Sequence, residues 1–232
     1  MTTEFENIII IPYRNRKTHL DYFIKNTVPL IEKCMPDTKV IVIEQEEGKL
    51  FNRGAILNTV FKMYKNRTKY FITHDVDINP TEKFITEKYN IELLNNNIQG
   101  LFTSVCNTLG GIIKISCSDI HNINGFPNNF WGWGGEDTAL QKRAEFYNKK
   151  ISKFLLNDKS CKDEYMIRFD DVNDRDTRNN YKNHLLYSSY FPTLSNEKKS
   201  DLIMETGLNN LEFKILETKK LHSIVELVKV SI

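Results

Sequence analysis

The sequence predicts an α/β fold, in which helices cover a largely parallel sheet. Three short apolar runs, typical of strands buried on both faces, begin at residues 7, 38 and 68. Two longer segments between these runs carry apolar residues at helical spacing. Strands that alternate with helices in this way form βαβ units, whose strands run parallel. The chain has 232 residues, and we expect 1–232 to form one domain.

The first half of the chain supplies these elements in order. The apolar run 7–11 is the first strand, and we expect Pro12 to end its pairing because proline lacks a donor N–H. An amphipathic helix is expected over 18–33. A second strand is expected at 38–44, followed by a second helix. This second helix is expected over 52–65. A third strand is expected within 68–80, where it runs into acidic residues.

The second half gives weaker signals. We expect further strands at 110–116, 153–157 and 164–169, and a helix over 137–147. Segment 170–183 is charged and almost without apolar residues, which favours a mobile loop or a surface helix. Apolar and polar residues alternate in 211–220 and 223–232, which predicts two antiparallel strands at an edge of the sheet. The predicted class is therefore α/β with a mostly parallel sheet and a small antiparallel C-terminal part.

Charge and hydropathy exclude several classes of function. The 32 basic and 30 acidic residues give a net charge of +2 and are interspersed, whereas nucleic-acid and anionic-membrane binders need clustered positive charge. No apolar run reaches the ~18 residues of a membrane span, and the acidic N-terminal segment is unlike a signal peptide. We therefore expect no nucleic-acid partner, no membrane span and a cytoplasmic or otherwise non-secreted location. The four cysteines suit free thiols, with a Cys106–Cys117 disulfide as the alternative.

Polar residues follow each of the first three strands. In open α/β sheets, ligands bind beyond the carboxyl ends of the strands, so one edge should carry Arg14, Arg16, Arg53, Asp75 and Asp77. Guanidinium groups there suit a phosphate, because they donate hydrogen bonds in pairs. Two aspartates separated by one residue repel each other unless a cation relieves them, and Mg²⁺ or Mn²⁺ favours such oxygen ligands. The alternative is a set of solvated loop charges.

The segment 124–140, NGFPNNFWGWGGEDTAL, combines tryptophans, glycines and two adjacent carboxylates. Its glycines give the backbone unusual freedom, and its tryptophans can stack on a sugar or a base. Glu136 and Asp137 supply a carboxylate that can take a proton from a hydroxyl. This combination is typical of a lid beside a catalytic base. The alternative is a tight structural turn with Trp131 in the core, followed by an acidic helix N-terminus.

The chain resembles the catalytic domain of the β-1,4-galactosyltransferase family from about Ile8 to its C-terminus. The matching motifs come in family order: IPYRNR, FNRG, DVD, GGI, NGFPNNFWGWGGED, MIR and GLNNLEFKILE. The resemblance implies a Rossmann-like fold of the GT-A type for nucleotide-diphospho-sugar transferases. It also implies transfer of a sugar from a UDP-sugar to an acceptor sugar, with inversion and a β-1,4 linkage.

The resemblance implies roles only for residues that lie within the matching motifs. Asp137 would be the general base, and Glu136 would help to seat the acceptor sugar. The protein ligands of Mn²⁺ would be Asp77 and Met166. The donor, UDP-galactose or UDP-GalNAc, would be bound by Pro12, Arg14, Arg16, Phe51, Arg53, Asp75, Val76, Thr108, Gly111 and Trp133.

One departure from the family pattern concerns the metal. The family commonly has MIRH, whose histidine is a metal ligand, whereas Phe169 stands there in this chain. Because a phenyl ring cannot ligate, either Asp170 or a water fills the position or metal binding is weakened. His74 beside the acidic residues is a further candidate ligand, and the alternative for it is a hydrogen-bonded residue at the strand end. We expect a metal dependence that is weaker than usual or altered in preference.

Other departures concern the substrates. Members that use galactose tend to have a tyrosine two residues before the Gly-Gly pair, where this chain has Thr108. The smaller side chain leaves room for an N-acetyl group, which makes UDP-GalNAc a candidate donor beside UDP-galactose. The acids that usually follow Glu136 and Asp137 are absent, which puts the usual GlcNAc-type acceptor in doubt. The alternative to an enzyme is a non-catalytic relative that binds a nucleotide sugar or a glycan.

Overall fold

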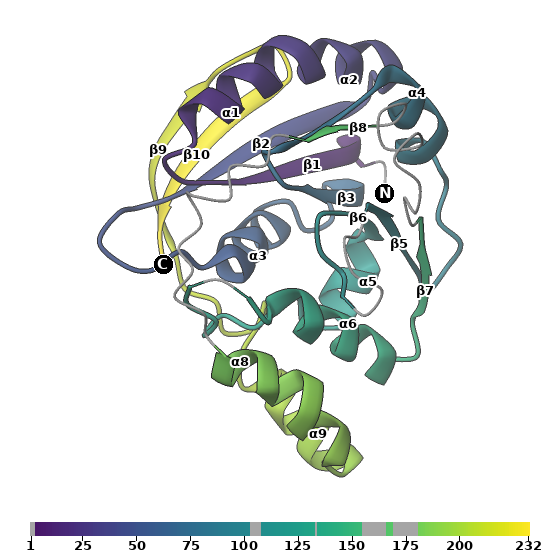
Figure 1. Ribbon diagram of the computed structural model, residues 1–232, viewed down its shortest axis with the longest axis vertical. Helices are drawn as coiled ribbons and strands as arrows, with labels where there is room; N and C mark the ends of the chain where they lie inside the picture. The colour runs from purple at the N-terminus through teal and green to yellow at the C-terminus, as the bar shows by residue number, and fades with distance from the viewer. Residues whose placement is uncertain (1–2, 103–107, 133, 155–165, 169–180) are drawn as a thin grey trace.

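The computed structural model describes residues 3–102, 108–132, 134–154, 166–168 and 181–232, of which 166–168 and 181 are described by their backbone only. The described strands form an eight-stranded sheet in the order β7-β5-β6-β3-β1-β2-β10-β9, with β4 and β8 as a separate pair (Figure 1). The strands of the large sheet are β1 Phe5–Tyr13, β2 Thr38–Gln45, β3 Thr68–His74, β5 Asn97–Phe102, β6 Ile112–Ser116, β7 Lys150–Lys153, β9 Lys214–Lys220 and β10 Val225–Ser231. The small pair consists of β4 Ile78–Pro80 and β8 Met166–Arg168.

The sheet is mostly parallel, as the sequence predicts. β1 runs parallel to β2 and β3, β10 parallel to β2, and β5 parallel to β7. β6 opposes both of its neighbours, and β9 opposes β10. The predicted antiparallel C-terminal pair is confirmed, but only β9 is at the edge. β10 lies between β9 and β2, so the end of the chain is built into the sheet.

Helices cover both faces of the sheet (Figure 1). One face carries α3, α5 and α6, and the other carries α1, α2 and α4. The bounds are α1 Lys17–Tyr22, α2 Val28–Cys34, α3 Arg53–Met63, α4 Glu82–Phe84, α5 Cys117–Asn122, α6 Glu136–Phe146, α8 Tyr181–Leu185 and α9 Asn196–Met204. Short π-helical or 3-10 turns extend these helices at Phe23–Thr27, Ile85–Tyr89, Leu186–Tyr190 and Phe191–Thr193.

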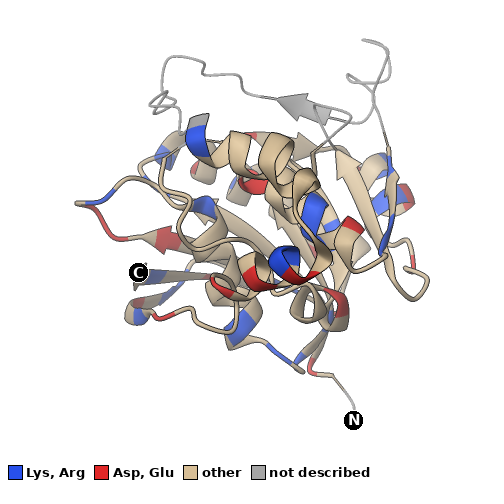
Figure 2. Cartoon of the chain, turned by 90° about the horizontal axis from the view of Figure 1, so that it is seen from below, with Lys and Arg blue, Asp and Glu red and all other residues tan. Residues whose placement is uncertain are grey.

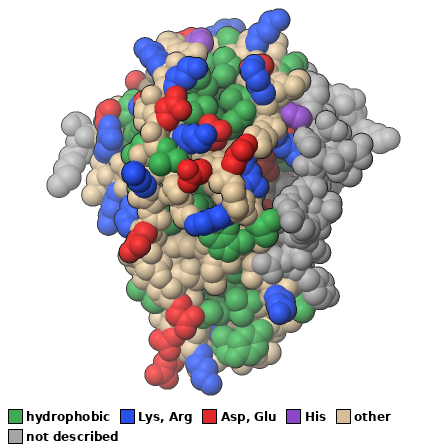
Figure 3. Space-filling model, turned by 90° about the vertical axis from the view of Figure 1, so that its left-hand side faces the viewer, with side chains coloured by type: hydrophobic (Ala, Val, Ile, Leu, Met, Phe, Trp, Pro, Cys, Tyr) green, Lys and Arg blue, Asp and Glu red, His purple; other side chains and the backbone are tan. Residues whose placement is uncertain are grey.

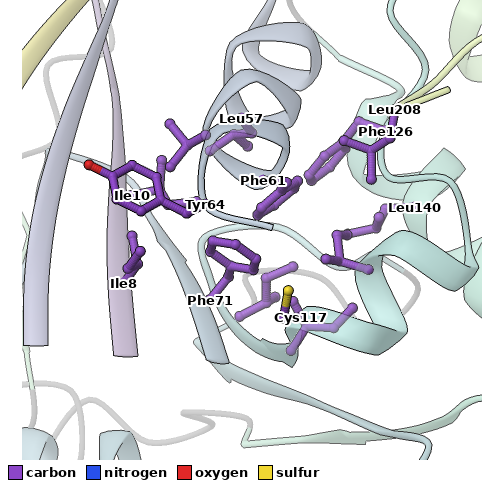
Figure 4. Packing of buried hydrophobic residues seen from close by; sticks show 14 of the residues in the cluster. Ile8, Ile10, Leu57, Phe61, Tyr64, Phe71, Cys117, Phe126, Leu140 and Leu208 are labelled. Atoms are coloured by element: carbon purple, nitrogen blue, oxygen red, sulfur yellow. The ribbon is translucent and has the colours of Figure 1, made fainter. Parts of the chain in front are cut away.

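Alternate residues of the central strands supply the two cores. Ile8 and Ile10 face the α3 side, whereas Ile9 and Ile11 face the α1 side, and all four are fully buried. This explains why the first strand is continuously apolar. On the α3 side, Phe61 packs edge-on against Phe71, as Figure 4 shows. A smaller third cluster joins α6 to α9 and to the turns Leu186–Tyr190 and Phe191–Thr193.

Pro12 does not end the pairing of β1, contrary to the expectation from the sequence. β1 stays in register with β2 through Tyr13, but its pairing with β3 stops at Ile10. Pro12 therefore lies where the strand has a partner on one side only, and proline is tolerated at such an edge because no ladder hydrogen bond is lost there.

Charged residues of both signs are spread over the described elements (Figure 2). On the face that carries β9 and β10, basic, acidic and hydrophobic side chains are intermixed (Figure 3). Cys34 and Cys117 are free thiols. Cys106, the other residue of the alternative disulfide, lies outside the described residues, as does Cys161.

Candidate active site

The carboxyl ends of β1, β2 and β3 meet at one edge of the sheet, because these strands are parallel neighbours. The loop after β2 is held by its own side chains. Gln45 donates from Nε2 to the carbonyl of Leu50 at 2.8 Å and accepts from the N–H of Asn52 at 2.7 Å. The Asn52 side chain then caps α3 by accepting from the N–H of Ala55 at 3.0 Å. This anchored loop fixes where Arg53, the first residue of α3, begins.

Arg53 gathers carboxylates from two distant parts of the chain. Its Nε and Nη2 donate to Oδ1 of Asp75, which follows β3, at 3.0 and 2.8 Å. Its Nη1 donates to Oδ1 of Asp137 in the first turn of α6 at 2.9 Å and lies 3.8 Å from Oε1 of Glu136. The Arg53 side chain is only 13% exposed. The site therefore brings the acidic end of β3 and the predicted catalytic acids together at one guanidinium.

Burial and mutual repulsion set the protonation of this cluster. Burial raises the pKa of Asp137 well above its usual range, against the effect of Arg53, which lowers it, and the charges of Glu136 and Asp75 raise it further. Burial likewise raises the pKa of Glu136 against the effect of Arg53. Burial alone would lower the pKa of Arg53, but the three carboxylates outweigh it and raise that pKa. The cluster therefore combines a fixed positive charge with two carboxyl groups, those of Glu136 and Asp137, that hold their protons to higher pH.

Glycines allow the close packing around Asp137. Gly135 precedes α6 with φ +94°, and a Cβ there would lie 2.9 Å from the backbone nitrogen of His184. A Cβ on Gly110 would contact Oδ2 of Asp137 and lie 2.9 Å from its Cγ. The Asp137 carbonyl also accepts from the N–H of Leu109 at 3.3 Å. The segment before β6 therefore forms one wall against the carboxylate.

The tryptophan-containing loop is docked on the loop after β2. The N–H of Gly132 donates to the carbonyl of Phe51 at 2.8 Å, and Lys49 lies over the Trp131 ring at 5.4 Å. Arg14 stacks over the Phe51 ring at 5.1 Å and donates from Nη1 to the carbonyl of Lys49 at 2.7 Å. Trp131 is half-buried, so the alternative that places it in the core is wrong. Trp133 lies outside the described residues.

The remaining predicted donor residues lie around the same edge in different environments. Pro12 is buried at the end of β1, and Arg16 is half-buried at the start of α1. Val76 is 5% exposed and packs in the core on the α1 side. Thr108 is half-buried, and its carbonyl accepts from Nζ of Lys153 at 2.9 Å. Gly111 has φ +75°, which favours glycine there.

His74 has the environment of a hydrogen-bonded residue at a strand end, not that of a metal ligand. It is fully buried, with ring contacts to Phe23 and Tyr89. Its Nδ1 donates to the carbonyl of Asp75 at 2.9 Å. Burial lowers its pKa to about 4, so the ring is neutral at pH 7. The bond fixes the turn that carries Asp75, whose carbonyl also accepts from the N–H of Ile78 at 3.1 Å.

The predicted metal residues lie in or next to two strands that pair with each other. β4 begins directly after Asp77, and β8 begins at Met166, with Pro80 opposite Met166. The pairing brings the two segments together, and a carboxylate beside them suits Mn²⁺. Within the described ranges, no three His, Cys, Asp or Glu side chains are grouped to hold a metal. The Met166 side chain, Phe169 and Asp170 lie outside what is described.

A network of asparagines, which the sequence does not reveal, supports the segment before the tryptophans. Asn58 of α3 donates to the Phe126 carbonyl at 2.7 Å and to Oδ1 of Asn128 at 2.8 Å. Asn128 donates to the Gly207 carbonyl at 2.7 Å. Asn124 exchanges hydrogen bonds with Asn209 at 3.0 and 2.9 Å. The NGFPNN and GLNN motifs therefore hold each other, and the only sequence signal for this pairing is their shared richness in asparagine.

We expect Asn58→Ala to lower the free energy of unfolding by about 2–4 kcal/mol, because it removes buried hydrogen bonds and leaves their partners unsatisfied. Asn58 is fully buried and also accepts from the N–H of Phe126 at 2.9 Å. Urea unfolding followed by circular dichroism measures the change. Asn26→Ala, which removes one exposed bond to the Tyr22 carbonyl, is the matched control and should change stability by less than about 0.5 kcal/mol. Equal effects of the two substitutions would contradict the prediction.

Arg143 is a second buried residue that the sequence does not single out. It is fully buried in α6 and donates from Nη1 to the carbonyls of Asn124 and Gly125, both at 3.0 Å. Its Nη2 donates to the Thr206 carbonyl at 2.7 Å. Burial lowers its pKa. Arg143 therefore ties α6 to the same two segments that the asparagines join.

A mostly parallel α/β sheet with an acidic cluster at its carboxyl edge is the architecture of the GT-A class of glycosyltransferases. The model for the N-terminal region of glycosyl transferase group 7 matches residues 2–89, and the model for the N-terminal domain of galactosyltransferase matches 86–168. The chain belongs to the β-1,4-galactosyltransferase family.

Curated relatives agree with this assignment. The chain is 35% identical to human β-1,4-galactosyltransferase 4 over 153 residues, which cover 63% of the chain and 44% of the relative. It is 30% identical to bovine β-1,4-galactosyltransferase 1 over 219 residues, which cover 91% of the chain and 51% of the relative. The chain therefore spans about half the length of the curated relatives that it matches.

Solved structures show the same fold. The catalytic domain of Drosophila β1,4-galactosyltransferase 7, in complex with xylobiose, superposes with a TM-score of 0.77 at 18% identity, covering 98% of this chain and 94% of that one. A mutant of the same enzyme, in complex with manganese, UDP-Gal and xylobiose, gives a TM-score of 0.76 at 19% identity and the same coverage. At this level of identity the likeness shows the GT-A fold.

The expected cytoplasmic or otherwise non-secreted location is wrong. The relatives that the chain matches are enzymes of the secretory pathway. The expectation depended on the N-terminal segment, and in a chain that spans about half of its relatives this segment carries no information about a leader or an anchor. Among the helices that the structure describes, none has the length and apolar character needed to cross a membrane.

Proposed function

We propose that this chain is an inverting glycosyltransferase that moves galactose or GalNAc from a UDP-sugar to a hydroxyl of an acceptor sugar, with a β-1,4 linkage. The observation that carries the proposal is the Arg53 cluster, in which the acidic end of β3 and Asp137 of α6 lie around one guanidinium. The Drosophila neighbour in complex with manganese, UDP-Gal and xylobiose supports a nucleotide-sugar donor and a sugar acceptor. We also propose that residues 1–232 act as one domain, since β1 and β10 belong to one sheet.

Asp137 is the proposed general base. The acceptor oxygen attacks the anomeric carbon as the bond from that carbon to the diphosphate oxygen breaks, and Asp137 takes the hydroxyl proton. Burial brings the pKa of Asp137 above its usual range, which makes it a stronger base once it is ionised. Glu136, buried beside it, helps to seat the acceptor. The donor faces the ends of β1 and β2, where Phe51 stacked by Arg14 offers a flat surface for uracil.

Asp77 and Met166 are the proposed protein ligands of Mn²⁺, which would supply positive charge to the departing diphosphate. The proposal is supported by the pairing of β4 with β8, in which Ile78, next to Asp77, lies opposite Arg168 of the strand that Met166 begins. A carboxylate oxygen suits Mn²⁺, whereas a thioether is a softer ligand.

The direct test is acceptor-dependent release of UDP. The chain is incubated with UDP-Gal or UDP-GalNAc, Mn²⁺ and an acceptor that ends in xylose or GlcNAc. We expect release above the rate without acceptor, and none above it for Asp137→Asn. If wild type and variant release UDP equally with every donor, acceptor and metal, the enzyme proposal fails. Calorimetric binding of UDP-sugar without turnover would then favour the second candidate, a non-catalytic binding relative, which is motivated by Phe169.

We expect Mn²⁺ to bind more weakly than in relatives with a histidine, because Phe169 offers no lone pair. Calorimetric titration of Mn²⁺ in the presence of UDP measures the affinity. Phe169→His should strengthen binding by about tenfold or more, as one imidazole ligand is restored. Phe169→Leu, which also lacks a ligand, is the matched control and should leave the affinity unchanged. Tight Mn²⁺ binding by the wild type that Phe169→His does not improve would contradict the prediction.

We expect the wild type to accept UDP-GalNAc, and Thr108→Tyr to shift selectivity toward UDP-Gal by about tenfold, because the larger ring fills the space for an N-acetyl group. The measurement is the ratio of kcat/KM for the two donors. Thr108→Ser, which keeps the small side chain, is the control and should retain use of UDP-GalNAc. Strict rejection of UDP-GalNAc by the wild type would remove the prediction.

A further inference from the structure

We propose that Arg53 is a positioning residue, which holds the Asp137 carboxylate in place and keeps it charged, and that it does not bind the donor diphosphate. The proposal rests on Asp137 being the general base of the proposed transfer reaction. It departs from the expectation of the sequence, in which Arg53 is one of several phosphate-binding arginines.

The first observation is that the hydrogen bonds of Arg53 are directed to carboxylates. A guanidinium has five N–H donors, and Arg53 directs three of its bonds to carboxylate oxygens of Asp75 and Asp137 at 2.8–3.0 Å. The side chain is 13% exposed and starts from a capped helix, so it has little freedom to turn elsewhere. A diphosphate would have only the two remaining N–H groups of this guanidinium to bind, unless it displaced a carboxylate.

The second observation concerns the charged groups that face Asp137. Arg53 faces it from α3, Asp75 from the turn after β3, and Glu136 from its own helix. Gly110, which packs against the carboxylate from the segment before β6, adds no charge. Among the strongest electrostatic influences on Asp137, the positive charge is that of Arg53. Without it, three carboxylates would share a partly buried site, and Asp137 would hold its proton to still higher pH.

The test compares the pH dependence of Arg53→Gln, Arg53→Lys and wild type. In the wild type, the acid limb of the kcat profile reports ionisation of the base. Arg53→Gln should move this limb to higher pH by about 1–3 units. Arg53→Lys keeps the charge but loses the planar fork, and it should give a smaller shift. Arg67→Gln removes an exposed arginine that pairs with Glu4, before β3, and is the matched control with an unchanged profile.

Two further measurements keep the proposal testable. UDP affinity, measured by calorimetry, should be similar in Arg53→Gln and Arg67→Gln. A loss of about tenfold or more in Arg53→Gln, with an unmoved acid limb, would identify a phosphate ligand and overturn the proposal. Circular dichroism checks folding, and if Arg53→Gln does not fold, the Arg53→Lys profile decides.

The link between Arg53 and Asp137 can also be measured without turnover. The ¹³C carboxyl resonance of Asp137, assigned by its loss in Asp137→Asn, should titrate at higher pH in Arg53→Gln than in wild type. If it titrates at the same pH, the proposal is wrong even where sugar transfer occurs. If the wild type transfers no sugar at all, the proposed function fails, and the resonance still shows whether Arg53 controls the charge of Asp137.

Discussion

Asp137→Asn is expected to lower kcat for sugar transfer by about 10²- to 10⁴-fold, the usual contribution of a general base. The amide has nearly the same shape and still reaches Arg53, but it cannot take the proton of the acceptor hydroxyl. UDP release with acceptor present measures the loss, and UDP affinity should be kept. Asp201→Asn, on the exposed face of α9, is the matched control with unchanged kcat. An Asp137→Asn enzyme with wild-type kcat would show that another group is the base.

The same substitution should stabilise the fold at neutral pH. Burial raises the pKa of Asp137 in the folded state above the value of about 3.9 for an unfolded chain. The folded state then binds more protons between these two values, so its stability falls as pH rises through this window. Asparagine does not titrate, and Asp137→Asn should be more stable than wild type at pH 7 by on the order of 1 kcal/mol. Urea unfolding should show this gain shrinking toward pH 4, whereas a variant that is less stable at pH 7 would contradict it.

Gly110→Ala is expected to lower kcat by about 10²-fold through displacement of the catalytic carboxylate. Gly110 is not among the glycines with positive φ, so alanine can adopt its backbone conformation. The new Cβ would contact Oδ2 of Asp137 and lie 2.9 and 3.5 Å from its Cγ and Cβ. The Asp137 side chain can move more easily than the backbone at Gly110. We therefore expect the carboxylate to move and to lose its 2.9 Å bond with Arg53.

A double-mutant cycle separates this effect from a general loss of structure. In Asp137→Asn the base is already absent, so adding Gly110→Ala should lower the residual kcat very little. UDP affinity and the unfolding midpoint serve as controls for the single variant. If the two losses in kcat multiply, Gly110→Ala acts somewhere other than at the carboxylate.

Most of the fold could be predicted, because the strands buried on both faces are unbroken apolar runs. β1, β2 and β3 and the helices after β1 and β2 lie where the sequence places them. β5 and α5 were missed because Asn97–Phe102 mixes polar and apolar residues and Cys117–Asn122 is a helix of only six residues. The place of β10 beside β2 could not be predicted, because alternation indicates a strand and says nothing about its neighbours.

The sequence predicts which residues belong to the site better than it predicts the contacts between them. The topology of the predicted sheet placed Arg53 and Asp75 at one edge, and the family resemblance made Asp137 the base, but no pattern shows that the arginine turns to the carboxylates. His74 was considered a metal ligand, and only its burial between two rings shows otherwise. Asn58 and Arg143 carry no signal in one sequence, since their importance comes from carbonyls far along the chain. The roles of Trp133, Met166 and Phe169 remain predictions.

The insertion of β10 between β2 and β9 has a consequence for how the chain is made. β1, β2 and β3 all lie within the first 74 residues, but the second edge of β2 has no strand to pair with until Val225–Ser231 has emerged from the ribosome. Such distant pairing slows folding, and it leaves an apolar strand edge open to other nascent chains meanwhile. In any fragment that stops before Val225, this edge of β2 would stay unpaired. Such a fragment should aggregate even though it contains every residue of the Arg53 cluster.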